Sequence, residues 1–112
     1  MENQHRKITG YRELSAEEIA LMNEIKELGP RIEEVILKVK THLAAQYESA
    51  WEGVDRTQVT LANPAQHPKP SKPDVLERLD AATPERFAAM AKTEFQTALM
   101  YLTRAVAQPT TF

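Results

Sequence analysis

The strongest constraint on the fold is a helix start signal followed by a long amphipathic repeat. In the sequence LSAEEI, Ser15 can accept a hydrogen bond from the backbone N–H three residues on, while Glu18 reaches back to Ser15. Apolar residues then recur every three or four positions from Ile19 to Leu43, which is the spacing of one helix face. These signals predict a helix over residues 15–52, ending near Gly53.

Prolines and turn residues divide the rest of the chain. At Gly29–Pro30 the proline removes an N–H donor and clashes with the carbonyl four residues back, so we predict a kink or short break there. Thr83–Pro84 is typical of an N-cap followed by proline at the first helical position, and Pro109 follows the end of that helix. No strand pattern is present, so the predicted fold class is all-α, an antiparallel helical hairpin with a kinked first helix.

The chain is expected to form a single helical domain. Its 112 residues, 42% of them apolar, support only a thin core, so we expect the helices to cover part of their apolar surface in a homo-oligomer. The predicted boundaries are a short N-terminal arm 1–14, a kinked helix 15–52, a proline-rich loop 53–73, a short helix 74–82, a long helix 84–107 and a tail 108–112.

Composition excludes several classes of function. A net charge of -2 with no long basic run argues against DNA binding, and no apolar run approaches the roughly 20 residues of a membrane span. The N-terminus lacks the apolar region of a signal peptide, so we expect a soluble intracellular protein. Without cysteine there is no thiolate nucleophile, and the widely spaced His5, His42 and His67 make a poor metal site.

Catalytic motifs are also missing, so we predict a protein that is not an enzyme and that needs no cofactor. Pairs such as Glu17 with Glu24, or Glu27 with Glu34, could in principle bind a metal, but their spacing is that of an ordinary solvated helix face. His42 is interpreted as a surface or core histidine rather than a general base. No catalytic or metal-ligating residue is assigned.

The arm over residues 3–12 (NQHRKITGYR) combines amide, cationic, glycine and aromatic groups just before the helix. Cations pair with phosphates, an aromatic ring stacks on a base, and glycine allows close approach. Two interpretations stay open: a site for a small anion with two or three phosphates, or a polar arm whose Tyr11 packs on its own helix. Lys26 either contacts a phosphate or forms an intrahelical ion pair, and Arg104, with Thr93 and Thr97 on a similar face, is a weaker candidate.

Two stretches, NQHRKITGYRELSAEEIALMNEIK at 3–26 and KTEFQTALMYLTRAVAQPTTF at 92–112, resemble a known family. They cover 24 and 21 residues, and the strings QHRKITGYREL and RAVAQPTTF carry most of the specificity. The chain closely resembles the bacteriophage anti-CBASS cyclic-nucleotide sponges and, more distantly, the helical hairpin of the Thoeris anti-defence sponges. Residues 53–82 look longer than the connection usual in that family.

The resemblance implies a homo-hexamer in the host bacterial cytoplasm that sequesters cyclic oligonucleotide second messengers without cleaving them. It implies Tyr11 and Lys26 as contacts for cyclic dinucleotides such as 3',3'-cGAMP. It also implies sites for cyclic trinucleotides built from both ends of the chain, at Gln4, Arg6, Gly10, Pro109 and Thr110.

Symmetry suggests how such ligands would be held. A cyclic dinucleotide suits a pocket on a two-fold axis, where each chain supplies half a site, and a cyclic trinucleotide suits a three-fold axis. Because Lys26 lies within the helix and Pro109 outside the regular helices, we expect separate pockets for the two ligands. The alternatives are a sponge for a cyclic ADP-ribose type signal, a phosphodiesterase that cleaves the same messengers, and a helical oligomeric adaptor without a ligand.

Overall fold

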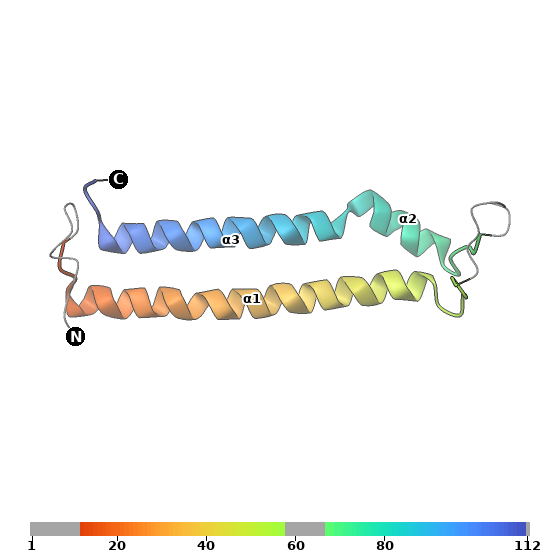
Figure 1. The fold of residues 1–112 in the computed structure, drawn as a ribbon, viewed down its shortest axis with the longest axis horizontal. Coiled ribbons are helices and arrows are strands. Elements are labelled where there is room, and N and C mark those ends of the chain that lie inside the picture. Colours follow the sequence, from red (N-terminus) through yellow and green to blue (C-terminus); the bar gives the residue numbers. More distant parts are fainter. Residues whose placement is uncertain (1–11, 58–66, 112) are drawn as a thin grey trace. The chain divides into compact units, whose positions relative to one another are not determined.

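The structure is a computed structural model that describes residues 12–57 and 67–111. These residues form three helices, α1 (Ala16–Ala50), α2 (Pro73–Ala82) and α3 (Pro84–Ala107), with no strand among them (Figure 1). The prediction of an all-α fold is confirmed. None of these helices has a segment long and apolar enough to cross a membrane.

The start of α1 has the predicted capping box. The Glu18 N–H donates to the Ser15 Oγ at 3.2 Å, and the Ser15 N–H donates to the Glu18 Oε1 at 2.9 Å. The Ile19 N–H donates to the Ser15 carbonyl at 2.9 Å, which closes the first helical turn. Two of the backbone donors that a helix start leaves unpaired are therefore satisfied by local partners.

Pro30 lies inside α1, so of the two outcomes predicted at Gly29–Pro30, a kink or a short break, the helix is not broken. The cost of the proline is local, because it removes one N–H donor from a helix of 35 residues. Apolar residues on both sides, Ile25 and Ile32, are half-buried, so the same face packs before and after the proline. Continuous packing of that face outweighs the poor helix propensity of one residue.

A single residue, Thr83, separates α2 from α3. Its backbone is left-handed, with φ of 46°, and its N–H donates to the Leu79 carbonyl at 2.9 Å. Thr83 therefore acts as the C-cap of α2. It also directly precedes Pro84, which is the first residue of α3 as the sequence predicted. The Arg86 N–H donates to the Thr83 carbonyl at 3.1 Å as α3 begins.

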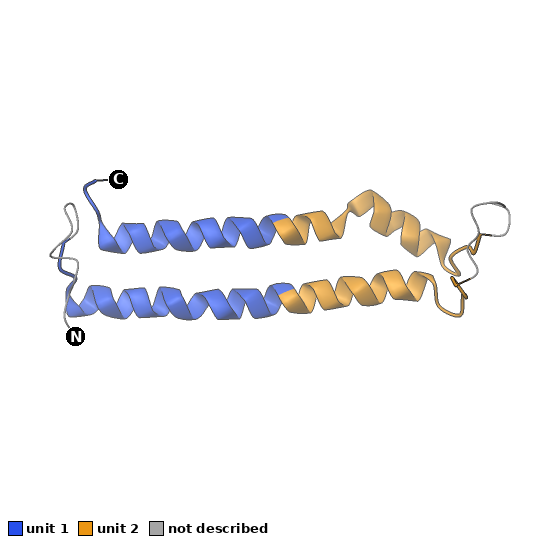
Figure 2. Ribbon diagram, in the orientation of Figure 1, with its two compact units in different colours: residues 1–36, 90–112 blue, residues 37–89 orange. Residues whose placement is uncertain are grey.

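The chain divides into two compact units, one formed by Met1–Ile36 with Met90–Phe112 and the other by Leu37–Ala89 (Figure 2). In the first unit α1 and α3 are antiparallel. Arg12, just before α1, contacts the last turn of α3, whereas Gly29, further along α1, lies near Leu99, which is earlier in α3. Residues from the two ends of the sequence thus come together in this unit.

The second unit holds the three apolar residues that are buried among those described, Leu43, Ala50 and Leu79. The Ser71 hydroxyl and the Lys72 N–H both donate to the Ala50 carbonyl, at 3.2 and 3.0 Å. These bonds join the segment that leads into α2 to the end of α1. Pro73 occupies the first turn of α2, where a missing N–H costs little.

A turn follows α1, and Gly53 within it has a φ of 76°, a conformation that favours glycine. After this turn, Arg56 donates to both carboxylate oxygens of Glu48, at 3.2 and 3.0 Å. Its guanidinium also lies 5.1 Å from the centre of the Trp51 ring. This ion pair is exposed, and it serves below as a control for another Arg–Glu pair.

Many large apolar side chains remain exposed. Met100 and Tyr101 on α3 are 70% and 69% exposed, and Leu37 on α1 is 63% exposed. Others on these helices are Ile19, Leu21, Leu28, Val35, Val39, Phe87, Met90, Phe95 and Leu102. The contacts described within one chain leave these surfaces uncovered.

Candidate functional site

An open groove of about 460 Å³ lies in the first unit. Its walls come from one stripe of each helix, since the lining residues follow the spacing of a helix face. Ala107 and Pro109 lie at the end of the α3 wall. The lining residues are Ile25, Lys26, Gly29, Leu99, Met100, Thr103, Arg104, Ala107 and Pro109.

Two cationic side chains, Lys26 and Arg104, line this mainly apolar groove. Within residues 12–57 and 67–111, neither the Lys26 ammonium nor the Arg104 guanidinium has a hydrogen-bond or ion-pair partner. The intrahelical ion pair considered for Lys26 is therefore not formed among the described residues. Two cations beside apolar walls suit a ligand that carries negative charge and also has apolar or aromatic surface.

Thr103 adds a hydroxyl to the same groove. Its Oγ1 donates to the Leu99 carbonyl at 2.9 Å, so the oxygen retains lone pairs that can accept a hydrogen bond. Sequence reasoning grouped Arg104 with Thr93 and Thr97, which do not line the groove. Thr103, the residue before Arg104, does line the groove. The spacing of four between Leu99, Thr103 and Ala107 places these residues on one helix face and could have predicted this.

The end of α3 brings the tail to the groove. Gln108 has a left-handed φ of 51°, and its N–H donates to the Arg104 carbonyl at 2.8 Å. This turn ends the helix and places Pro109 in the groove wall. Lys26 and Pro109 therefore line one groove, although the sequence suggested that they belong to separate regions.

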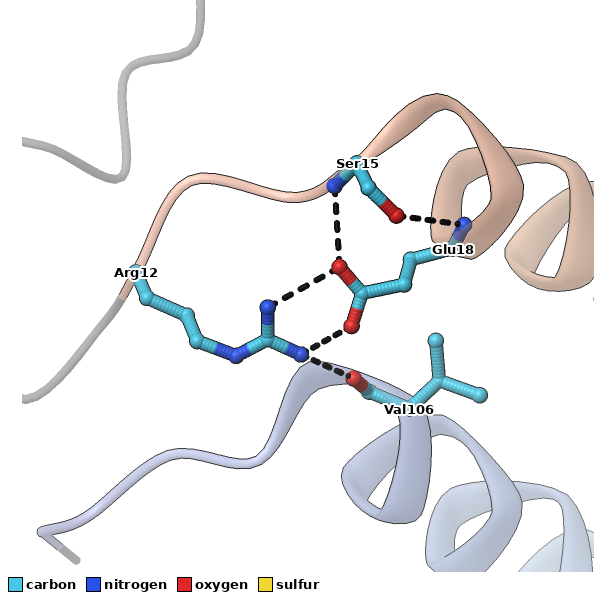
Figure 3. Close-up of polar contacts among 4 residues, drawn as sticks. All are labelled: Arg12, Ser15, Glu18 and Val106. Carbon is cyan, nitrogen blue, oxygen red and sulfur yellow. Dashed lines mark hydrogen bonds and ion pairs between the residues drawn. The ribbon is translucent and has the colours of Figure 1, made fainter.

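A cluster of polar contacts joins the start of α1 to the end of α3 (Figure 3). The Arg12 Nη1 donates to the Glu18 Oε1 at 2.9 Å, and the Arg12 Nη2 donates to the Glu18 Oε2. The same Nη2 donates to the Val106 carbonyl at 2.8 Å. We call Arg12, Glu18, Ser15 and the Val106 carbonyl the clasp.

The clasp shifts the titration of both charged partners. Hydrogen bonds from Arg12, and then from the Ser15 backbone, lower the pKa of Glu18 to about 2. The bond to Glu18 raises the pKa of Arg12. Glu18 lies in the first turn of α1 and Arg12 contacts the last turn of α3, so each charge also faces the favourable end of a helix dipole.

The remaining predicted site residues are placed as follows. Thr110 is exposed and follows Pro109 without lining the groove. Tyr11, with the predicted trinucleotide contacts Gln4, Arg6 and Gly10, lies outside the described residues. Their roles stay predictions.

Histidines and carboxylates do not form a metal centre in the described part of the chain. No group of three or more His, Cys, Asp or Glu side chains gathers there. His42 is exposed on α1 in the second unit and does not line the groove. The arrangement within residues 12–57 and 67–111 is therefore one that can bind an anion, and it presents no metal-ligand cluster.

These features define a class of protein: a small all-helical hairpin with an open groove that is lined by two cationic side chains. The chain belongs to the Acb2/Tad1 hairpin family, whose hairpin-domain model matches residues 3–107. It is also similar to Anti-CBASS protein 2 of Pseudomonas phage JBD67, with 39% identity over 109 residues that cover 97% of each chain. The resemblance seen in the sequence is confirmed.

Proposed function

We propose that this protein is a phage anti-CBASS protein that binds cyclic oligonucleotide second messengers of the bacterial host and holds them intact. The observation that carries the proposal is a pair of cations, Lys26 and Arg104, in one groove beside apolar walls, with no partner for either among residues 12–57 and 67–111. A cyclic dinucleotide such as 3',3'-cGAMP has the matching chemistry, with two phosphates and two flat bases. The similarity to Anti-CBASS protein 2 supports the same function.

In the proposed dinucleotide site, Lys26 and Arg104 contact phosphates and Tyr11 stacks on a base. Charge-assisted hydrogen bonds are worth about 1.5 to 3 kcal/mol each and a stacked base about 1 to 3 kcal/mol. One chain would then supply at most about 9 kcal/mol, whereas a nanomolar dissociation constant corresponds to about 12 kcal/mol. Two copies of these residues are needed, even before the cost of association is counted.

The exposed apolar surface also supports assembly of several copies of the chain. Met100 lines the groove and yet is 70% exposed, so one side of the groove stays open in a single chain. A second copy that covers this side would enclose the ligand and contribute its own Lys26 and Arg104. We propose a homo-hexamer, as the family resemblance implies.

For cyclic trinucleotides we propose Gln4, Arg6, Gly10, Pro109 and Thr110 as contacts. Pro109 shares the groove with Lys26 within one chain, so independent binding of the two ligand classes requires that the trinucleotide contacts meet in a different part of the assembly. A competition titration decides this point. One-for-one displacement of a trinucleotide by a dinucleotide would contradict separate sites.

The test is calorimetric titration of the assembled protein with cyclic dinucleotides, cyclic trinucleotides, cyclic ADP-ribose and a linear dinucleotide. We expect stoichiometric binding of a cyclic dinucleotide, about 10-fold or greater weakening in Lys26→Ala and Arg104→Ala, and unchanged affinity in the control Lys92→Ala. Lys92 is exposed on α3 and does not line the groove. No binding of any cyclic oligonucleotide would favour the adaptor, and tight binding of cyclic ADP-ribose alone would favour the other sponge class.

The enzyme alternative needs its own measurement. Ligand released from the complex by heating is separated by chromatography, and a sponge returns it uncleaved. Recovery of linear product that depends on the protein would contradict sequestration and favour a phosphodiesterase.

A further inference from the structure

The clasp joins two segments that are 94 residues apart in sequence, and it does so through one guanidinium. We propose that Arg12 and Glu18 are positioning residues of the ligand site, which fix how the tail after Val106 leaves α3. This inference rests on the proposed function for its consequence in binding.

The geometry requires arginine and a carboxylate. The Glu18 Oε1 accepts from both the Ser15 N–H and the Arg12 Nη1, while the Oε2 accepts from the Arg12 Nη2. A planar guanidinium can form this bidentate contact with the carboxylate and still donate a further hydrogen bond to a backbone carbonyl. A lysine ammonium is a single point of charge and cannot reproduce the set.

The clasp also contains a feature that stability alone does not explain. The Arg12 Nε is buried and has no hydrogen-bond partner among the described residues. A buried donor without an acceptor opposes folding. This nitrogen therefore adds no stability within the described residues, while the other two nitrogens of the guanidinium hold Glu18 and the Val106 carbonyl.

The position of the tail matters because the tail leads to a residue of the groove. Val106 precedes the left-handed Gln108 by two residues and the groove residue Pro109 by three. The Arg12 bond to the Val106 carbonyl therefore holds the backbone directly before the turn that places Pro109 in the groove wall.

The first experiment measures ligand affinity in assembled Arg12→Ala, Arg12→Lys and Glu18→Gln proteins. Glu18→Gln keeps a side chain that can cap the Ser15 N–H but removes the charge pair. The matched control is Arg56→Ala, which breaks an Arg–Glu pair in the other unit. We expect about 10-fold weaker binding of 3',3'-cGAMP in Arg12→Ala, no rescue by lysine, a smaller loss in Glu18→Gln, and parent affinity in the control.

A double-mutant cycle separates positioning from a general structural effect. If Arg12 acts through the tail, then Arg12→Ala adds little to the loss already caused by Pro109→Ala. Helix content measured by circular dichroism should stay at the parent value in every variant. Additive losses, rescue of affinity by Arg12→Lys, or parent affinity in Arg12→Ala would overturn the assignment.

The second experiment needs no ligand. Hydrogen exchange of the amides in residues 104–111 should become faster in Arg12→Ala and stay unchanged in Arg56→Ala. Equal exchange in parent and Arg12→Ala would show that the clasp does not hold the tail and would overturn the proposal. Failure of the parent protein to bind any cyclic oligonucleotide would instead overturn the proposed function, while this exchange measurement still decides the role of the clasp.

Discussion

Replacing Pro30 by alanine tests whether α1 is continuous, because the sign of the effect differs between a continuous and a broken helix. In the structure Pro30 lies within α1, so the carbonyl of residue 26 cannot receive the usual N–H bond from residue 30. Alanine would restore that donor and remove the ring. We therefore expect Pro30→Ala to stabilise the protein.

The magnitude follows from helix propensity and chain length. Proline costs about 3 kcal/mol relative to alanine in a helix interior, and position 30 is exposed, so little packing is lost with the ring. Unfolding entropy of about 2.1 cal/mol/K per residue gives about 0.24 kcal/mol/K for 112 residues. The expected rise in Tm is therefore up to about 13 °C.

Circular dichroism during thermal unfolding measures this rise, at one fixed protein concentration because self-association would shift Tm. Glu33→Ala is the control, since residue 33 is exposed on the same helix and glutamate and alanine are both good helix formers. If instead the chain broke at Gly29–Pro30, the proline would begin a second helix, where it is favoured, and alanine would not stabilise it. An unchanged or lower Tm in Pro30→Ala would refute a continuous α1.

Two further predictions concern the clasp and the second unit. Because the pKa of Glu18 is lowered from 4.5 to about 2 on folding, its contribution to stability is complete above about pH 4.5 and is lost as the pH falls towards 2. The stability difference between the parent and Glu18→Gln should be constant from pH 7 to 5 and shrink below that range, and a difference that grows on acidification would contradict the sign. Leu79 is 4% exposed, so Leu79→Ala should lower the free energy of unfolding by about 2 to 5 kcal/mol in urea titrations; a loss under about 1 kcal/mol would contradict its burial.

The sequence predicted the helices well because their signals are local. The capping box at Ser15 and Glu18 involves only neighbouring residues, and α3 spans the predicted range 84–107. Two details needed the structure. The choice between a kink and a break at Pro30 depends on packing of the apolar face on both sides of the proline, and the C-cap role of Thr83 depends on how closely α2 precedes α3.

The candidate site was less predictable, because it depends on contacts between distant parts of the chain. Lys26 was singled out from its place on the helix and from family resemblance, yet its proximity to Arg104 and Pro109 required the antiparallel pairing in the first unit. The Arg12 bond to the Val106 carbonyl could not be inferred at all, since a backbone carbonyl leaves no mark in the sequence. Arg12 appeared in the sequence only as one charge of a basic arm.

The exposed cations and the exposed apolar residues point to the same physical requirement. A ligand held by Lys26 and Arg104 in an open groove would keep part of its charge in water, where ionic contacts are weak. Closing the groove with a second copy would strengthen these contacts and would also bury apolar side chains such as Met100. In the proposed sponge, assembly and tight binding are therefore one property.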